Sequence, residues 1–230
     1  FDYETEASIG ITVTATSADG STSSQAFTLA VSDVNEAAVS SISDTNAAAN
    51  AVDENSAIGT SVGITAFASD ADGTATVSYS LSNDAGGLFA IDATTGEVTV
   101  AGTLDREAAA SYDIVVTATS SDGSTSTQSY TIALNDLDEF DITPVSDSDA
   151  SANGLAENAA AGTAVGVVAQ ASDADATNSA VSYSVNDARF TVDADGTVRV
   201  ANGASFDYET EASIGITVTA TSADGSTSSQ

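Results

Sequence analysis

The chain lacks histidine, cysteine, methionine and tryptophan, and its basic residues are three arginines with no lysine. Without histidine, cysteine and lysine, it cannot build a Ser-His or Cys-His nucleophile system or use lysine chemistry. Without cysteine it has no disulfide framework and no thiolate ligand for a soft metal. A single proline, Pro144, argues against a flexible proline-rich linker. No apolar run reaches about 18 residues, so the sequence predicts no direct membrane insertion.

The charge of the chain is strongly one-sided. The 3 basic residues face 34 acidic ones, and the net charge is −31. Such a polyanion cannot bind nucleic-acid phosphates or anionic lipid headgroups through its surface. Its self-repulsion also opposes a compact state unless counter-ions neutralise it. The acids therefore serve either as a generally solubilising surface or as specific sites for divalent cations, and their placement decides between the two.

The sequence is repetitive. Residues 1–25 recur without change at 206–230, which is 205 residues later. A shorter period of about 103 residues lies within this double unit, and it is marked by three landmarks: Glu54-Asn55 and Glu157-Asn158, Asp70-Ala71-Asp72 and Asp173-Ala174-Asp175, and Asp2-Tyr3-Glu4 with Asp105-Arg106-Glu107 and Asp207-Tyr208-Glu209. Repetition at a fixed period indicates tandem modules.

The landmarks divide the chain into three segments. Residues 1–36 form the C-terminal part of one repeat, residues 37–139 a complete repeat, and residues 140–230 a repeat without its last strand. The chain has no initiator methionine and begins inside a repeat, so we expect it to be a window cut from a longer array. The alternative is that Ala26–Val31 of one chain completes the last repeat of the next chain, head to tail, by strand addition.

Within each repeat the pattern is that of β-strands. Ser111–Ala118 alternates apolar and polar residues, and Ser129–Leu134 alternates again after an Asp122-Gly123 hairpin signal. Shorter apolar runs precede them, at Val62–Phe67, Val77–Leu81, Leu88–Ile91 and Val98–Val100. About seven short strands in about 100 residues is typical of an immunoglobulin-like sandwich. The sequence therefore predicts an all-β chain of tandem seven-stranded Greek-key sandwiches arranged end to end.

Acidic residues recur as pairs separated by one residue. The recurring pairs are Asp2/Glu4, Asp70/Asp72, Asp105/Glu107, Asp136/Asp138, Asp173/Asp175 and Asp207/Glu209. Residues i and i+2 of an extended chain point to the same side, where two like charges repel unless a cation joins them. Calcium suits such a pair, because it takes about 6–8 oxygen ligands, whereas magnesium prefers a stricter octahedron. Asp193 and Asp195 have the same spacing but sit at a hairpin tip, where turn capping explains them.

A wider motif resembles a known family. Leu88–Glu107, LFAIDATTGEVTVAGTLDRE, resembles the signature of cadherin repeats, in which an F-x-I-D…T-G hairpin precedes L-D-R-E. The other landmarks keep the family order and end in a D-x-[ND]-E linker. The linker D-L-D-E-F-D, at 136–141, is similar to that of the cadherin-like repeats of bacterial RTX-type adhesins and other large surface proteins.

The resemblance implies calcium sites at the junctions between repeats. For the first junction it implies Asp2, Glu4, Asp33, Asn35, Glu36, Asp70 and Asp72. For the second it implies Glu54, Asp105, Glu107, Asp136, Asp138, Glu139, Asp173 and Asp175. A third would begin with Glu157, Asp207 and Glu209. The chain departs from the animal pattern at the later A-x-D acid, which is blurred into the stretch 118–122.

The function expected is structural. The chain would be a calcium-rigidified stalk or filament of an extracellular, cell-surface adhesion protein, with neighbouring identical repeats or chains as homophilic, head-to-tail partners. The alternative is a recognition module for a glycan or for another copy of itself. Its aromatic residues follow strand patterns and are better explained as core: Phe67, Tyr79, Phe89, Tyr112 and Tyr130. Paired carboxylates can hydrolyse glycosides, but every recurring pair is assigned to a junction, so we do not expect an enzyme.

Overall fold

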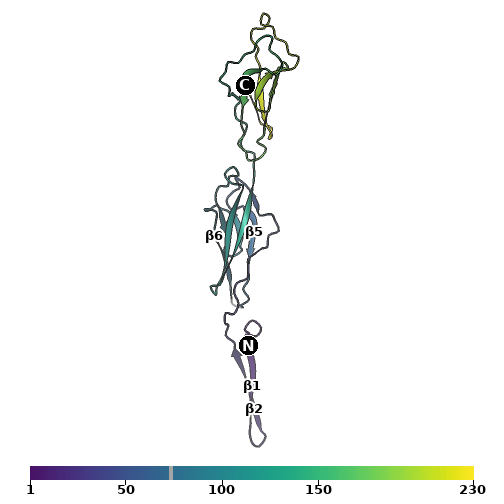
Figure 1. Cartoon of the computed structure of the whole chain (residues 1–230). Coiled ribbons are helices and arrows are strands. Elements are labelled where there is room, and N and C mark those ends of the chain that lie inside the picture. The colour runs from purple at the N-terminus through teal and green to yellow at the C-terminus, as the bar shows by residue number, and fades with distance from the viewer. Residues whose placement is uncertain (73–74) are drawn as a thin grey trace. The chain divides into compact units, whose positions relative to one another are not determined.

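The computed structural model describes residues 1–72 and 75–230, and all of its regular structure is β. The chain divides into two compact units, Phe1–Asn135 and Asp136–Gln230, which are described separately below (Figure 1). The all-β prediction is confirmed over these residues. Within the described ranges there is no helix long and apolar enough to cross a membrane.

Unit 1 contains a sandwich of two four-stranded sheets. One sheet has the order β4-β10-β9-β6 and the other β3-β5-β8-β7. The strands are β3 (Ser43–Asp44), β4 (Ala51–Asp53), β5 (Ser61–Phe67), β6 (Val77–Asn83), β7 (Phe89–Ile91), β8 (Glu97–Val100), β9 (Ser111–Ser120) and β10 (Thr125–Asn135). The first strand is split, because β3 pairs antiparallel with β5 while β4 pairs parallel with β10. The seven predicted strands are thus present as eight pieces.

The core of this sandwich is made of small aliphatic side chains from both sheets. Ile64 of β5, Val98 of β8, and Ile114 and Ile132 of β9 and β10 are fully buried. The alternation along β9 places Ile114, Val116 and Ala118 inside, as the period-two pattern predicts. Of the aromatic residues, Tyr79 and Phe89 are buried and Tyr112 and Tyr130 pack against the core. Phe67 was predicted as core, but it is exposed at the end of β5.

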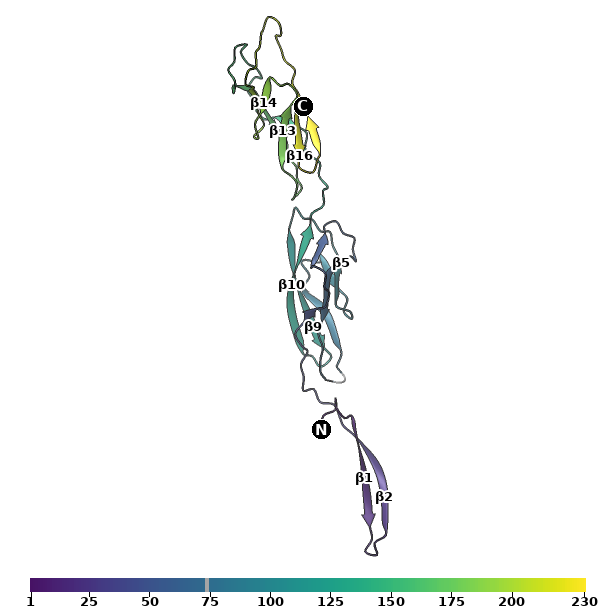
Figure 2. The same cartoon turned by 90° about the vertical axis from the view of Figure 1, so that its right-hand side faces the viewer.

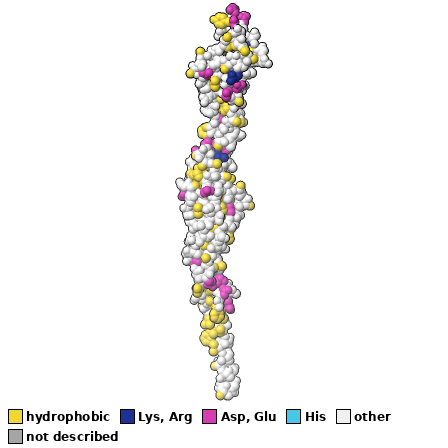
Figure 3. Space-filling view, viewed as in Figure 1, with side chains coloured by type: hydrophobic (Ala, Val, Ile, Leu, Met, Phe, Trp, Pro, Cys, Tyr) yellow, Lys and Arg dark blue, Asp and Glu magenta, His cyan; other side chains and the backbone are white. Residues whose placement is uncertain are grey.

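Unit 1 also holds an N-terminal hairpin of β1 (Ser8–Thr16) and β2 (Thr22–Ala30), shown in Figure 2. Ile11 pairs with Phe27 and Ile9 with Leu29. A two-stranded sheet has no second sheet to cover it, so its apolar face stays open. Phe27 and Leu29 are 47% and 50% exposed, and Figure 3 shows hydrophobic side chains over this hairpin.

Unit 2 repeats the fold with fewer paired strands. Its sheets have the orders β11-β12-β15-β14 and β13-β16-β17. The strands are β11 (Ser146–Asp147), β12 (Ala164–Gln170), β13 (Val181–Val185), β14 (Phe190–Val192), β15 (Thr197–Val200), β16 (Val218–Ser222) and β17 (Thr227–Ser229). Val198, Val200, Val218 and Ala220 form the centre of its core. The second half of β10 has no counterpart within the 230 residues.

One glycine in each sandwich lets two strands approach closely. Gly96 follows the β7–β8 turn with a φ of +73°, and its carbonyl accepts the N–H of Ala66 on β5. A Cβ at this position would overlap the carbonyl oxygen of Ala66. Gly196 makes the same approach to Ala169 in unit 2. The turn therefore needs glycine both for its backbone angle and for space.

We expect Gly96→Ala to destabilise unit 1 by about 3 kcal/mol or more, because backbone strain and a backbone clash add together. Gly123→Ala is the matched control, since Gly123 also has a positive φ (+93°) but a Cβ there meets nothing within 4 Å. That variant should lose only about 1 kcal/mol. Urea unfolding of both variants measures the difference, and equal losses would contradict the clash.

Candidate metal centres

The first acidic group lies at one end of the unit 1 sandwich. Asp70 and Asp72 stand in the loop between β5 and β6, and Asp122 stands in the β9–β10 turn. One carboxylate oxygen from each lies within 4.8 Å of the others. Asp72 is only 6% exposed. The N–H of Ser124 donates to Asp122 (2.7 Å) and lowers the pKa of that carboxyl, so Asp122 stays charged.

Backbone groups of the preceding linker bind this group directly. The N–H of Glu36 donates to Asp72 Oδ1 at 3.3 Å, and the N–H of Ala37 donates to both Asp72 oxygens. The side-chain amide of Asn35 donates to Asp122 Oδ2 at 2.9 Å. Asp70 Oδ1 accepts the N–H of Asp72. Asp70 Oδ2 is buried and accepts no hydrogen bond from any described residue.

Further predicted residues of the first junction lie close by. The pKa of Glu36 is raised, first by desolvation and then by the charges of Glu4, Asp72, Asp33 and Asp2. A raised pKa means that the fold disfavours the charged form of Glu36. Of the seven residues predicted for the first junction, the structure brings Asp70 and Asp72 together with Asp122, and the set as a whole stays a prediction.

Unit 2 repeats this arrangement with one change. Asp138, Asp175 and Asp224 each place one carboxylate oxygen within 4.8 Å of the others, and Asp138 takes the place that Asp70 has in the first group. The N–H groups of Glu139 and Phe140 donate to Asp175, as those of Glu36 and Ala37 do to Asp72. Asp136 accepts the N–H of Thr177 at 2.8 Å.

The change is a carboxylate in place of an amide. Asp138 occupies the sequence position of Asn35, so an acid stands in unit 2 where unit 1 has an amide. The pKa of Asp138 is raised by desolvation and then by the charges of Asp224 and Asp175. Asp173 Oδ2, like its counterpart in Asp70, is buried and accepts no hydrogen bond from the described residues.

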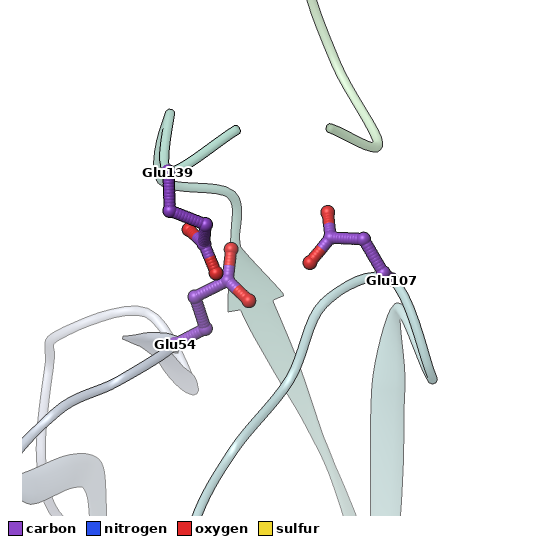
Figure 4. Close-up of side chains that lie close together, drawn as sticks. All are labelled: Glu54, Glu107 and Glu139. Carbon is purple, nitrogen blue, oxygen red and sulfur yellow. The ribbon is translucent and has the colours of Figure 1, made fainter. Parts of the chain in front are cut away.

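A second kind of group lies at the opposite end of each sandwich. In unit 1, Glu54 follows β4 beside the end of β10, and Glu107 precedes β9. Their carboxylate oxygens lie within 4.8 Å of each other, and Figure 4 shows both turned toward the same space. Glu54 is fully buried and accepts the N–H of Arg106 at 2.6 Å. In unit 2, the corresponding residues Glu157, Asp207 and Glu209 form an exposed group of three.

Basic side chains do not neutralise the Asp70 or Asp138 groups. In the described ranges, the ion pairs join Arg189 to Asp187 and Glu211, and Arg199 to Asp193. None of these acids belongs to a predicted site. The donor sets are entirely oxygen and they converge, and the Asp70 group contains a buried oxygen that accepts no hydrogen bond from the described residues. These properties fit a hard divalent cation such as calcium.

The structure also shows what sequence reasoning missed. Asp122 and Asp224 complete the two groups, but neither was among the predicted ligands, because Asp122-Gly123 indicates a hairpin turn and the family's later A-x-D acid is located only to the stretch 118–122. Their constant spacing of 102 residues was the available signal. Asp105 was predicted as a ligand, but its carboxylate accepts the N–H of Ala108 at 2.9 Å and belongs to none of the groups above. The second-junction set as a whole stays a prediction.

Comparison with known proteins identifies the middle of the chain. Residues 49–135 match the Cadherin domain model. The chain is 40% identical over 117 residues to rat Cadherin-17, covering 49% of this chain and 13% of the relative. It is 32% identical over 149 residues to human Protocadherin Fat 4, covering 63% of this chain and 3% of the relative. The chain thus spans a small part of the length of these relatives.

Solved structures show the same fold over the whole chain. A structure titled mouse Cadherin-23 EC22-24 is 26% identical, with a TM-score of 0.71, and the match covers 100% of this chain and 74% of that one. The Protocadherin GammaB4 extracellular domain matches with a TM-score of 0.76 at 23% identity, covering 100% of this chain and 36% of that one. The predicted sandwich fold is confirmed. The middle of the chain is similar to cadherin domains, which are structural adhesion modules and not enzymes.

The Asn35/Asp138 difference generates a testable pair of variants. In chelator at pH 7, Asp138→Asn should raise the melting temperature of unit 2, because it removes a charge that the fold disfavours. The effect should shrink as the pH falls toward the ordinary value of 3.8, because the native carboxyl then becomes neutral in both states. Addition of calcium should raise the melting temperature of the Asp138→Asn variant by less than it raises that of the parent chain.

Asn35→Asp is the matched reverse variant, because it gives the first group the acid that the second has. It should lower the melting temperature of unit 1 in chelator and enlarge the rise caused by calcium. Differential scanning calorimetry measures all four changes. Shifts of the same sign for both variants in chelator would contradict the charge argument.

Proposed function

We propose that the chain is a calcium-stiffened extracellular adhesion repeat, part of the stalk of a larger surface protein. One observation carries the proposal. A buried aspartate, Asp72 or Asp175, joins an all-oxygen acidic group and also accepts the backbone N–H groups of the linker before it. A cation held by this group would therefore fix the linker to the repeat.

Calcium is favoured over other cations by the donor set. The Asp70, Asp72 and Asp122 group offers three carboxylates, which can bind through one oxygen or two, together with the neighbouring acids Asp33 and Glu36. Calcium accepts this number and variety of oxygens, whereas magnesium keeps several waters and a strict octahedron. When bound, calcium supplies positive charge where the fold brings like charges together.

The position of the groups explains how a cation would stiffen a tandem array. The β9 and β10 strands run antiparallel, so the Asp122 turn and the Glu54–Glu107 pair lie at opposite ends of the sandwich. Each repeat thus presents acidic oxygens at both ends, near the places where its linkers enter and leave. Binding that requires the folded, ordered linker stabilises that state by mass action.

The likeness to extracellular cadherin domains supports a location outside the cell. The recurrence of 25 identical residues after 205 suits a spacer, in which the number of units matters more than the chemistry of each. The linker at 136–141 and the Ala/Asp-rich composition resemble those of the cadherin-like repeats of bacterial RTX-type adhesins, and this resemblance supports a bacterial surface protein.

Calcium removal tests the proposal. We expect chelator to lower the melting temperatures of both units and to increase the flexibility seen in solution scattering. At a calcium concentration of 100 times its Kd, the ion should contribute about 2.7 kcal/mol for each independent site. Asp72→Asn should abolish most of the calcium response of unit 1.

Asp92→Asn is the matched control in the same unit. Asp92 also accepts backbone N–H groups, those of Thr94 and Thr95, but it caps a hairpin turn and lies outside the acidic groups. Its calcium response should equal that of the parent chain. An unchanged melting temperature in chelator, or an equal loss of response in both variants, would refute the proposed function.

A further inference from the structure

Two Asn-Gly steps occur in the chain, and the structure places them in different surroundings. They are Asn153-Gly154 and Asn202-Gly203, both in unit 2. At an Asn-Gly step the glycine nitrogen can attack the asparagine amide carbon, because glycine has no side chain to hinder the approach. All four residues are exposed, so solvent reaches both steps. What distinguishes the two steps is the hydrogen bonding of the glycine N–H.

The first step is held by a neighbouring strand. The N–H of Gly154 donates to the carbonyl oxygen of Val165 on β12 at 2.9 Å. The backbone of Asn153 also lies against β12, since a Cβ built on Gly166 would come within 3.3 Å of the Asn153 Cα. The Gly154 nitrogen is therefore directed toward β12 and away from the Asn153 side chain. Reaction at this step requires local opening of the strand edge.

The second step lies in an open turn. The N–H of Ala204 donates to the carbonyl oxygen of Ala201 at 3.3 Å and closes this turn. The N–H of Gly203 donates to no carbonyl of the described chain, and the Asn202 amide makes no hydrogen bond with a described residue. A Cβ built on Gly203 would meet nothing within 4 Å, so the space around this residue is free. Neither reacting group is restrained.

The turn is open because the chain is longer here than in unit 1. The connection that follows β15 has two residues more than the one that follows β8 and leads to the same landmark, Asp105 or Asp207. In unit 1, the N–H groups of Ala101 and Gly102 both donate to the carbonyl oxygen of Leu88. The added residues of unit 2 lie outside such a contact.

We propose that Asn202 is a site of spontaneous deamidation in the folded chain, whereas the fold protects Asn153. The Gly203 nitrogen bonds to Cγ of Asn202, the Cγ–Nδ2 bond breaks, and the amide leaves as ammonia with the proton of Gly203. Solvent water then opens the five-membered succinimide at one of its two carbonyls. The product is aspartate or isoaspartate. One water is consumed, one ammonia is released, and nothing is oxidised or reduced.

The product differs from the parent chain in charge and in backbone. Either form adds a carboxylate to a chain that already carries a net charge of −31. Isoaspartate also adds a methylene group to the backbone between β15 and Phe206, which packs against the core of unit 2. The reaction therefore marks a copy of the chain with its age. This inference goes beyond the proposed calcium function and does not depend on it.

Trypsin allows the two steps to be followed separately, because the chain has arginine only at 106, 189 and 199 and no lysine. Cleavage gives peptide 200–230, in which Asn202 is the sole asparagine, and peptide 107–189, which contains Asn153. The chain is incubated at mildly alkaline pH, where the backbone nitrogen loses its proton more readily, once folded and once in urea. Mass spectrometry with fragmentation then measures the conversion of each amide to an acid over time.

In the folded chain, Asn202 should convert at least about tenfold faster than Asn153, which reacts only through local opening. In urea the two should convert at similar rates, because the Gly154–Val165 hydrogen bond is lost. Asn202→Gln is the matched control, since its longer side chain would have to close a six-membered ring. Peptide 200–230 of that variant should keep its amide at position 202.

Three results would overturn the proposal. Asn202 and Asn153 could convert at equal rates in the folded chain. Peptide 200–230 of the folded chain could gain no acid during a time in which both asparagines convert in urea. The Asn202→Gln variant could gain acid at position 202 as fast as the parent chain.

Discussion

Repulsion between converging carboxylates is the constraint on which the rest of this structure depends. The fold brings Asp70, Asp72 and Asp122 together, and it brings Asp138, Asp175 and Asp224 together again in unit 2. With three arginines for 34 acids, side chains cannot balance these groups. The raised pKa values of Glu36 and Asp138 show that the charged state is disfavoured. A bound divalent cation would remove this penalty, so under the proposed function the acids that weaken the bare fold would strengthen the loaded one.

The sandwich provides what such a site needs, which is a fixed frame to which the linker is hydrogen-bonded. Aliphatic side chains such as Ile64, Val98 and Ile114 fill a thin core, and the acids stand on the turns that this core holds in place. Asp72 connects the core to the linker, because it is buried and accepts the N–H groups of Glu36 and Ala37. Ordering of the linker and charge at the site are therefore linked through one side chain.

Sequence reasoning predicted those parts of the fold that have a local signal. The alternation of apolar and polar residues predicted β9 and β10, and the Asp122-Gly123 pair predicted the turn between them. Both signals are local, because side-chain period and turn chemistry act over a few residues. The split of the first strand into β3 and β4 was not predicted, since strands of two or three residues are set by backbone pairing with distant partners. Asp122 was missed for a related reason. The Asp-Gly turn and the blurred A-x-D position at 118–122 do not single it out as a ligand, and only the fold shows that the turn lies beside Asp70 and Asp72.

The two repeats share a fold but differ in charge at one position beside their acidic groups, where one has Asn35 and the other Asp138. Asn35 donates its amide hydrogen to Asp122, so the first group is satisfied in part without a cation. Asp138 in the same position cannot donate, and it adds a negative charge beside Asp175 and Asp224. Oxygen sites tune their affinity for calcium through the number of charged ligands. We therefore expect one substitution on a repeated frame to make neighbouring sites unequal, with the more acidic site less stable when bare and more dependent on its ion.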